Sequence, residues 1–378
     1  MLDLLNGFLG TAVPFLIVLT VLVFVHEMGH FLVARYNGVR VEVFSIGFGP
    51  ELFGWTDKAQ TRWKFSAVPL GGYVKMFGDA NAASQPGAAV EEMTPAERAV
   101  SFHAKRLGQR AWIVAAGPLV NFLFAIVLLF GLFVTQGQPF TPPVVGDVLP
   151  DSAAAEAGIL PGDRIVAIDG STIERFEDVQ RIIRERGEHQ LRITIQRDGK
   201  QFNLTTTPKI TELTDNFGNK RKIGLLGVTR SEVEYVRRGP IEGLWRATEE
   251  SYNLSVSTLE AVGQIIAGTR AADQLGGPLR IAQMSGQVWE VGVPALIWFM
   301  AVLSLNLGLI NLFPVPMLDG GHLLYYVIEA LRGRPLGERA QEFGFRIGLA
   351  LVLSLMLFVT VNDLIQLKVF EFFRGLAS

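Results

Sequence analysis

The residues best suited to chemistry lie in His26-Glu27-Met28-Gly29-His30, directly after an uncharged run from Phe8 to Val25. On a helix, H-E-x-x-H spacing places two imidazoles on one face, where they can bind one zinc ion beside a glutamate that can act as general base. Ionisable side chains at the edge of a membrane-length apolar helix are costly unless they face a protein interior. The motif therefore predicts a zinc hydrolase with its active site within the bilayer.

The composition indicates a membrane protein with a narrow choice of metal ligands. Of the 378 residues, 49% are hydrophobic and 19% are charged, and the apolar residues lie in long runs. A net charge of −2 gives no electrostatic reason to expect nucleic acid as a partner. The absence of cysteine excludes disulfides, thiolate zinc sites and cysteine nucleophiles, so a metal must be held by His, Asp or Glu.

Four segments reach the length of about 20 apolar residues that a spanning helix needs. They lie near residues 7–34, 111–135, 294–318 and 344–367, and prolines interrupt the third near its end. The first is unlike a cleaved signal peptide, because no Lys or Arg precedes it and no small-residue cleavage site follows it. Basic residues gather between the first and second spans and between the third and fourth. The positive-inside tendency makes both of these loops cytoplasmic and leaves the termini and the middle region outside.

Two segments outside the spans have β-strand patterns. Residues 41–76 contain short alternating runs punctuated by glycines, which are typical of short strands. Residues 143–230 alternate strand and helix patterns, with hairpin-turn dipeptides at Asp169-Gly170 and Asp198-Gly199. Farther on, apolar residues recur at three-to-four spacing over 241–266. That spacing predicts an amphipathic helix on the outer membrane face or against the middle domain.

A third metal ligand is expected, because catalytic zinc usually takes three protein ligands and a water. Two of the five histidines are already in the motif, so a carboxylate near another span is favoured. Asp319 is the best candidate, since Pro314 and Pro316 break the third apolar segment just before it. Such a break at membrane depth is tolerated only where the freed backbone groups line a cavity or are buried in protein. Asp319 could instead cap a helix or a turn.

Four motifs follow one another along nearly the whole chain: His26-Glu-Met-Gly-His30, Pro69-Leu-Gly-Gly-Tyr-Val-Lys-Met76, Ala116-Gly-Pro-Leu-Val-Asn121 and Ser304-Leu-Asn-Leu-Gly-Leu-Ile-Asn-Leu-Phe-Pro-Val-Pro-Met-Leu-Asp-Gly-Gly-His322. Together they resemble the site-two protease family of intramembrane zinc metalloproteases, and most closely its bacterial regulator of sigma-E protease branch. This resemblance implies one Zn²⁺ ion held by His26, His30 and Asp319, in agreement with the argument above. Glu27 would be the catalytic base that takes a proton from water and returns it to the departing amine.

The resemblance also implies residues that hold a locally unwound substrate. These are Asn306, Asn311, Pro314 and Pro316. Gly71 and Gly72 would lie in a membrane-associated hairpin that presents a strand edge to substrate. Two simpler readings stay open. Asn306, like Asn121 in the second span, could only join helices, and the two glycines could be no more than a turn.

The middle region resembles a PDZ domain of circularly permuted type. Gly224, Leu225, Leu226 and Gly227 match the carboxylate-binding loop of that domain, although the loop could be degenerate and bind no free C-terminus. The chain has room for one such domain, whereas the best-known members of the branch have two. That difference puts in doubt the size-filter role ascribed to a tandem pair.

We therefore expect a polytopic α-helical membrane protein with four transmembrane helices, a membrane-associated β-hairpin region and one inserted extracytoplasmic PDZ-like α+β domain. The expected order is a first transmembrane helix with the HExxH motif (1–36), a cytoplasmic loop with the β-hairpins (37–110), a second transmembrane helix (111–136), the PDZ-like domain (143–230), an amphipathic helical linker (237–290), a third transmembrane segment with a broken end (293–318), a cytoplasmic loop (319–343) and a fourth transmembrane helix (344–368).

The expected function is that of a zinc metalloendopeptidase that cuts single-pass membrane proteins in or near their transmembrane segment, in regulated intramembrane proteolysis. By the resemblance, its substrates would be anti-sigma factor-like proteins in a stress response, or remnant signal peptides. We expect a monomer in the lipid bilayer of the bacterial inner membrane, with the active site toward the cytoplasmic side and the PDZ-like domain in the periplasm.

Two other functions are weighed against this one. A non-catalytic PDZ-bearing membrane scaffold would not need His26, Glu27, His30 and Asp319 all intact. A metal transporter would have ionisable residues spread over several spans, whereas here they are confined to two places.

Overall fold

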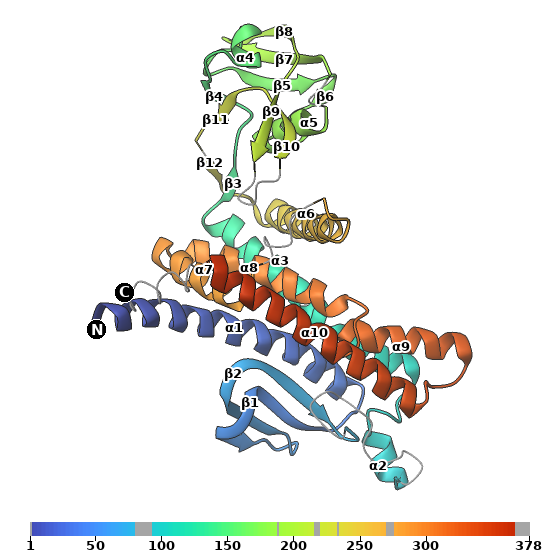
Figure 1. Ribbon diagram of the computed structural model, residues 1–378. Coiled ribbons are helices and arrows are strands. Elements are labelled where there is room, and N and C mark those ends of the chain that lie inside the picture. The colour runs from blue at the N-terminus through green and yellow to red at the C-terminus, as the bar shows by residue number, and fades with distance from the viewer. Residues whose placement is uncertain are drawn as a thin grey trace. The chain divides into compact units, whose positions relative to one another are not determined.

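The computed structural model describes residues 2–79, 93–186, 189–214, 220–232, 234–269 and 276–366 (Figure 1). The chain divides into two compact units. One comprises Met1–Leu132 and Pro240–Ser378 and is called the membrane unit below. The other comprises Phe133–Gly239 and is called the inserted unit.

Four helices in the described part of the chain are long and apolar enough to cross a membrane. They are α1 (Leu2–Tyr36), α3 (Leu107–Thr135), α8 (Val293–Leu312) and α10 (Glu338–Gln366). The chain is therefore a multi-pass membrane protein, as its apolar runs predicted. The last two residues of the expected fourth helix, 367–368, lie outside the described residues.

The third span ends where its prolines begin. α8 stops at Leu312, and Phe313 has the extended backbone (φ −62°, ψ 140°) that a following proline favours. α9 (Asp319–Arg332) then begins at Asp319 itself, so the segment 319–343, expected as a loop, opens with a helix. The break in the span therefore places Asp319 at a helix start.

Three further helices belong to the membrane unit. They are α2 (Pro95–Val100), α6 (Pro240–Ile266) and α7 (Pro278–Val291). α6 confirms the helix predicted from the apolar spacing over 241–266. Its apolar side chains Ile241, Trp245 and Tyr252 are not covered by other parts of the protein. Such exposure is expected of a helix that lies against a membrane surface.

The expected β-hairpin region consists of two long strands, β1 (Val41–Thr56) and β2 (Arg62–Met76), where short ones were expected. Each strand pairs twice, because both bend. Val43 is paired with Lys75 on one side and with Arg62 on the other. Gly47 and Gly49, with φ of +89° and +86°, supply the backbone conformations that such a bend requires.

Aromatic packing attaches this sheet to α1. The ring of Phe44 stacks on Trp63, with ring centroids 4.5 Å apart, and Phe31 of α1 meets both rings edge-on. Phe31 and Phe44 are buried in the same apolar cluster. The sheet is therefore fixed to the helix that carries the HExxH motif.

The inserted unit is built on a four-stranded sheet in the order β6-β5-β7-β8. These strands are β5 (Arg164–Ile168), β6 (Ser171–Thr172), β7 (Leu191–Arg197) and β8 (Lys200–Thr206). Both predicted hairpin turns are confirmed. Asp169-Gly170 joins β5 to β6, Asp198-Gly199 joins β7 to β8, and all four residues have positive φ.

The remaining elements of the inserted unit are β3 (Gln138–Phe140), β4 (Val145–Val148), α4 (Ala153–Glu156), α5 (Phe176–Glu185), β9 (Lys209–Thr214), β10 (Lys220–Leu225), β11 (Val228–Arg230) and β12 (Glu234–Val236). Three strand pairs form among them: β9 with β10, β4 with β11, and β3 with β12. Fully buried Ile165, Ile168, Leu191, Ile193 and Ile195 form the centre of the core. The unit therefore has its own hydrophobic core.

One ion pair ties the edge of that core together. Both oxygens of Asp163 accept from the guanidinium of Arg197, each at 2.7 Å, and Oδ2 also accepts from the Leu160 backbone N–H. Burial alone would raise the pKa of Asp163, but these hydrogen bonds outweigh burial and hold the pKa below its ordinary value. The pair therefore stabilises the folded unit only while the carboxyl is ionised.

We predict that Arg197→Gln lowers the free energy of unfolding of the inserted unit at pH 7 by about 1.5–3 kcal/mol, the usual contribution of hydrogen bonds to a charged group. Because the folded-state pKa of Asp163 is depressed, its contribution is present above the unfolded pKa and is lost as the pH falls through the folded pKa. Hydrogen exchange at the core amides of the full-length protein measures the difference, which should shrink toward zero in strong acid.

The control is Arg186→Gln, which breaks the more exposed pair with Asp169 in the same unit. Such a surface pair contributes about 0–1 kcal/mol. Equal losses in the two variants would contradict the special role of Asp163.

Candidate metal centre

α1 presents His26 and His30 on one face, as their spacing predicts. Their Nε2 atoms lie 3.3 Å apart and both residues are buried. Nδ1 of His30 lies 2.9 Å from the main-chain carbonyl oxygen of Ile113 in α3. A carbonyl oxygen can only accept, so His30 carries its proton on Nδ1 and its Nε2 lone pair is available to a metal.

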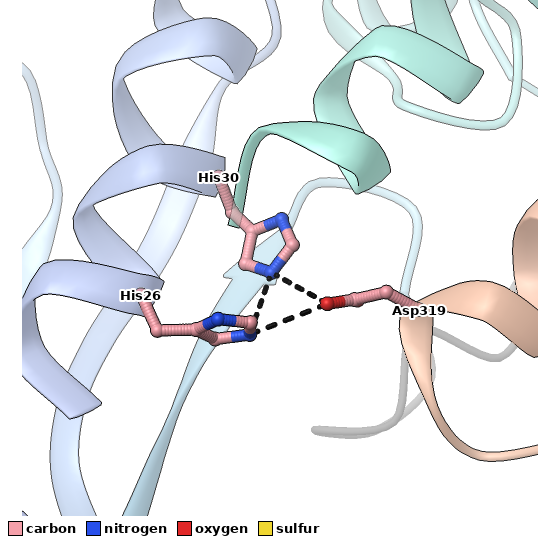
Figure 2. Close-up of side chains that lie close together, drawn as sticks. All are labelled: His26, His30 and Asp319. Carbon is pink, nitrogen blue, oxygen red and sulfur yellow. Dashed lines mark hydrogen bonds and ion pairs between the residues drawn. The ribbon is translucent and has the colours of Figure 1, made fainter. Parts of the chain in front are cut away.

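The start of α9 brings a carboxylate to these imidazoles. Oδ2 of Asp319 lies 3.3 Å from Nε2 of His26 and 3.5 Å from Nε2 of His30 (Figure 2). A carboxyl group in this position can bind a metal only when it is ionised.

The three ligand atoms have the spacing of a tetrahedral zinc site. Bonds of about 2.0–2.1 Å from zinc to nitrogen or oxygen require ligand atoms about 3.3–3.4 Å apart at tetrahedral angles. The distances among the two Nε2 atoms and Oδ2 are 3.3, 3.3 and 3.5 Å. Oδ2 of Asp319 is also buried without a hydrogen bond in the described part of the chain. A cation would satisfy that oxygen, so these residues fit zinc.

Glycines allow α9 to start against the end of α8. A Cβ at Gly320 would lie 2.3 Å from the carbonyl oxygens of Leu312 and Phe313, and one at Gly321 would lie 2.4 Å from that of Val315. Each contact is too short for any side chain. The two glycines therefore permit close backbone packing as well as a turn, and this packing sets the position of Asp319.

A second pair of glycines brings α1 and α3 together at the site. A Cβ at Gly29 would lie 2.5 Å from the carbonyl oxygen of Ala116. One at Gly117 would lie 2.3 Å from Nε2 of His30 and 2.9 Å from Cε1 of His26. Gly117 therefore leaves the space that both imidazoles occupy.

A cavity of about 420 Å³ adjoins the three ligand residues, and Glu27 lines it. Gly71, Gly72 and Asn311, three of the residues expected to contact substrate, line it as well. Val74, in the β2 segment that follows Gly72, also lines the cavity. The arrangement places a potential base, the ligand set and a strand of the sheet around one cavity.

The other expected substrate residues lie elsewhere in the described structure. Asn306, Pro314 and Pro316 are not among the residues that line this cavity. Oδ1 of Asn306 accepts a hydrogen bond from the Thr258 hydroxyl of α6, so Asn306 joins two helices here. Pro316 packs against α10, where a Cβ at Gly348 would collide with its carbonyl oxygen. Their roles in substrate binding stay predictions.

The expected peptide-binding loop is partly built into the core of the inserted unit. The Leu226 side chain is buried there, and the carbonyl oxygens of Leu226 and Gly227 accept from the backbone N–H groups of Ala154 and Leu149. Gly224 pairs with Ile210 in the β9–β10 hairpin. Leu225 is the one member of the loop with an exposed side chain. Capture of a peptide by this loop stays a prediction.

Several residues of the site were not identified as such from the sequence. Ile113 and Gly117 contact the imidazoles from α3, Asn121 lies 3.0 Å from Nδ1 of His26, and Val74 lines the cavity with Glu27. The available signals were the motif Ala116-Gly-Pro-Leu-Val-Asn121 and the presence of an asparagine within an otherwise apolar span. A backbone group such as the Ile113 carbonyl has no signal in the residue type.

Comparisons with known proteins agree with this geometry. The family described as "Peptidase family M50" matches residues 14–355. A Rhizobium meliloti protein named "putative zinc metalloprotease" is 49% identical, over 96% of this chain and 98% of that protein. The metalloprotease MmpA of Caulobacter vibrioides is 38% identical, over 98% of this chain and 99% of that protein. A PDZ domain from Listeria monocytogenes is 22% identical, over 24% of this chain and 88% of that domain. Its TM-score of 0.19 does not establish a shared fold.

We predict that Gly117→Ala removes zinc from the purified protein, because the new methyl group would occupy the place of the His30 imidazole. Metal analysis of the detergent-purified full chain measures the zinc-to-protein ratio. Gly131→Ala in the same helix is the matched control, since its Cβ would meet no heavy atom within 4 Å. Full zinc content in Gly117→Ala would show that the imidazoles do not need this space.

Proposed function

We propose that this chain, which belongs to peptidase family M50 and is a zinc metalloprotease, hydrolyses a peptide bond in or near the transmembrane segment of single-pass membrane proteins. The observation that carries the proposal is the convergence of His26, His30 and Asp319 at tetrahedral spacing. These ligands come from a candidate membrane span and from the helix that follows the break in another. The site would therefore hold zinc at membrane depth, where the segment to be cut lies.

His26, His30 and Asp319 would hold the zinc ion, which would supply acidification of a water molecule and polarisation of the scissile carbonyl group. Glu27 accepts the proton of the attacking water and returns it to the departing amine. Glu27 lines the cavity together with Val74 of β2. Both roles fit a glutamate that lines the same cavity as the ligands.

A substrate helix must be unwound locally, because its scissile carbonyl is otherwise engaged in the helix's own hydrogen bonds. The freed backbone groups need partners within the cavity. Asn311 and the strand segment after Gly71 line the cavity and offer a side-chain amide and main-chain groups. We assign these elements to the unwound segment, which would lie along the strand as an added edge.

The surroundings of the reaction follow from loop charge and family resemblance. We propose that the metal site lies toward the cytoplasmic side of a bacterial inner membrane and the inserted unit in the periplasm, and the basic loops support this orientation. We propose that the inserted unit is a PDZ-like domain that senses or excludes substrates by their external part. Anti-sigma factor-like proteins and remnant signal peptides are the substrates that fit such an arrangement, in a stress response regulated by intramembrane proteolysis.

We predict that Glu27→Gln binds zinc at the wild-type ratio but cleaves a single-pass membrane substrate at least about 100-fold more slowly, the usual contribution of a positioned acid–base group. The amide keeps the size of the side chain and cannot accept the water proton. Cleavage of a reporter in proteoliposomes and metal analysis of the same preparation measure the two effects. Turnover at the wild-type rate would remove Glu27 from the mechanism.

We predict that Asp319→Ala lowers the zinc-to-protein ratio well below that of the wild type, because two imidazoles alone leave a catalytic zinc site one protein ligand short. Metal analysis after dialysis against a weak chelator is the measurement. Glu342→Gln, which removes an exposed carboxylate paired with Arg346, is the control and should keep its zinc. An unchanged ratio in Asp319→Ala would assign the third ligand to another residue.

A further inference from the structure

Asn121 of α3 is fully buried beside the metal centre. Its side-chain Nδ2 lies 3.0 Å from Nδ1 of His26. Its Oδ1 is buried and has no hydrogen-bond partner in the described part of the chain. A buried amide oxygen without a partner destabilises the folded state, so this half of the amide calls for an explanation.

The contact with His26 fixes which ring nitrogen carries the proton. An amide Nδ2 can only donate, so in this orientation His26 Nδ1 accepts and the proton of the neutral ring is on Nε2. Nε2 of His26 is the atom that lies 3.3 Å from Oδ2 of Asp319. A protonated Nε2 has no lone pair left for a metal. The present orientation of the amide therefore conflicts with zinc binding.

A half-turn of the amide about its Cβ–Cγ bond removes the conflict. Oδ1 then faces Nδ1, gains the partner that it lacks and accepts the Nδ1–H of His26. The lone pair of Nε2 is released toward the metal position. Metal-bound histidines almost always donate their second N–H to an acceptor of this kind, and His30 already does so to Ile113.

We propose that Asn121 is a positioning residue that selects the metal-binding tautomer of His26, by accepting its Nδ1–H through Oδ1 when zinc binds. This inference rests on the proposed role of His26 as a zinc ligand.

The simpler role of joining helices is filled by another part of the same residue. The Ser304 hydroxyl of α8 donates to the main-chain oxygen of Asn121 at 2.8 Å. α8 also approaches α3 closely at Gly308, where a Cβ would lie 3.1 Å from the Pro118 carbonyl oxygen. The Asn121 backbone thus anchors the two helices, and its side chain is free to serve the imidazole.

The test compares two substitutions of nearly the same size in the purified full-length protein. Asn121→Asp keeps an oxygen that can accept from Nδ1–H, whereas Asn121→Leu keeps the volume and removes every polar atom. The zinc dissociation constant is measured by competition with a chromogenic chelator, and the ligand-field absorption of the Co²⁺-substituted protein reports the geometry of the ligands. We expect zinc binding about 10–100-fold weaker in Asn121→Leu, with a changed Co²⁺ spectrum. Asn121→Asp should stay close to the wild type in both.

Three results would overturn the inference. One is wild-type zinc affinity in Asn121→Leu. Another is a loss in Asn121→Asp as large as in Asn121→Leu, which would mean that the amide matters as a donor. The third is an equal loss in Ser304→Ala, which would mean that contact between α3 and α8 explains the effect. His26→Ala tests the underlying assignment separately, since unchanged zinc binding there would refute His26 as a ligand.

Discussion

The membrane unit depends on one costly arrangement, in which two buried imidazoles and a half-buried carboxylate lie within 3.5 Å of one another. Polar groups leave water at this cost only when a partner compensates them. The helix packing around them follows from the same constraint. Gly117 leaves room for both rings, and Gly320 lets α9 begin close enough to deliver its carboxylate. Helix packing and ligand geometry therefore cannot be changed independently at this centre.

The parts of the site that could be predicted from sequence are those fixed by local geometry or by the cost of burial. The spacing of His26 and His30 places both on one helical face. A carboxylate that follows two prolines at membrane depth is costly unless it lines a cavity or is buried in protein. Packing between segments distant in sequence could not be predicted. The hydrogen bond of Asn306 with Thr258 and the burial of Leu226 in a core are examples, and the binding roles expected of both residues stay predictions.

The fold shows the same division. The four candidate spans were predicted from the lengths of apolar runs, and the two hairpin turns from Asp-Gly dipeptides. Both signals lie in residues that are neighbours in sequence, and both predictions are confirmed. The strands of the hairpin region are longer than expected. The glycines that were expected to end short strands lie instead at bends within continuous strands. Because the strands bend, residues of β1 pair with β2 on both sides. The stacked aromatic rings of the sheet pack against Phe31 and attach the sheet to α1. Glu27, on α1, is therefore held beside the strand that lines the same cavity.

The two sources of the ligand set have a thermodynamic consequence. His30 and Asp319 are almost three hundred positions apart, so a bound ion acts as a cross-link between the two ends of the membrane unit. Anything that binds the native state alone stabilises it by an amount that grows with the logarithm of its free concentration. Zinc supply would thus set how long each molecule survives as well as how fast it turns over, and a cell short of the metal would lose the enzyme itself.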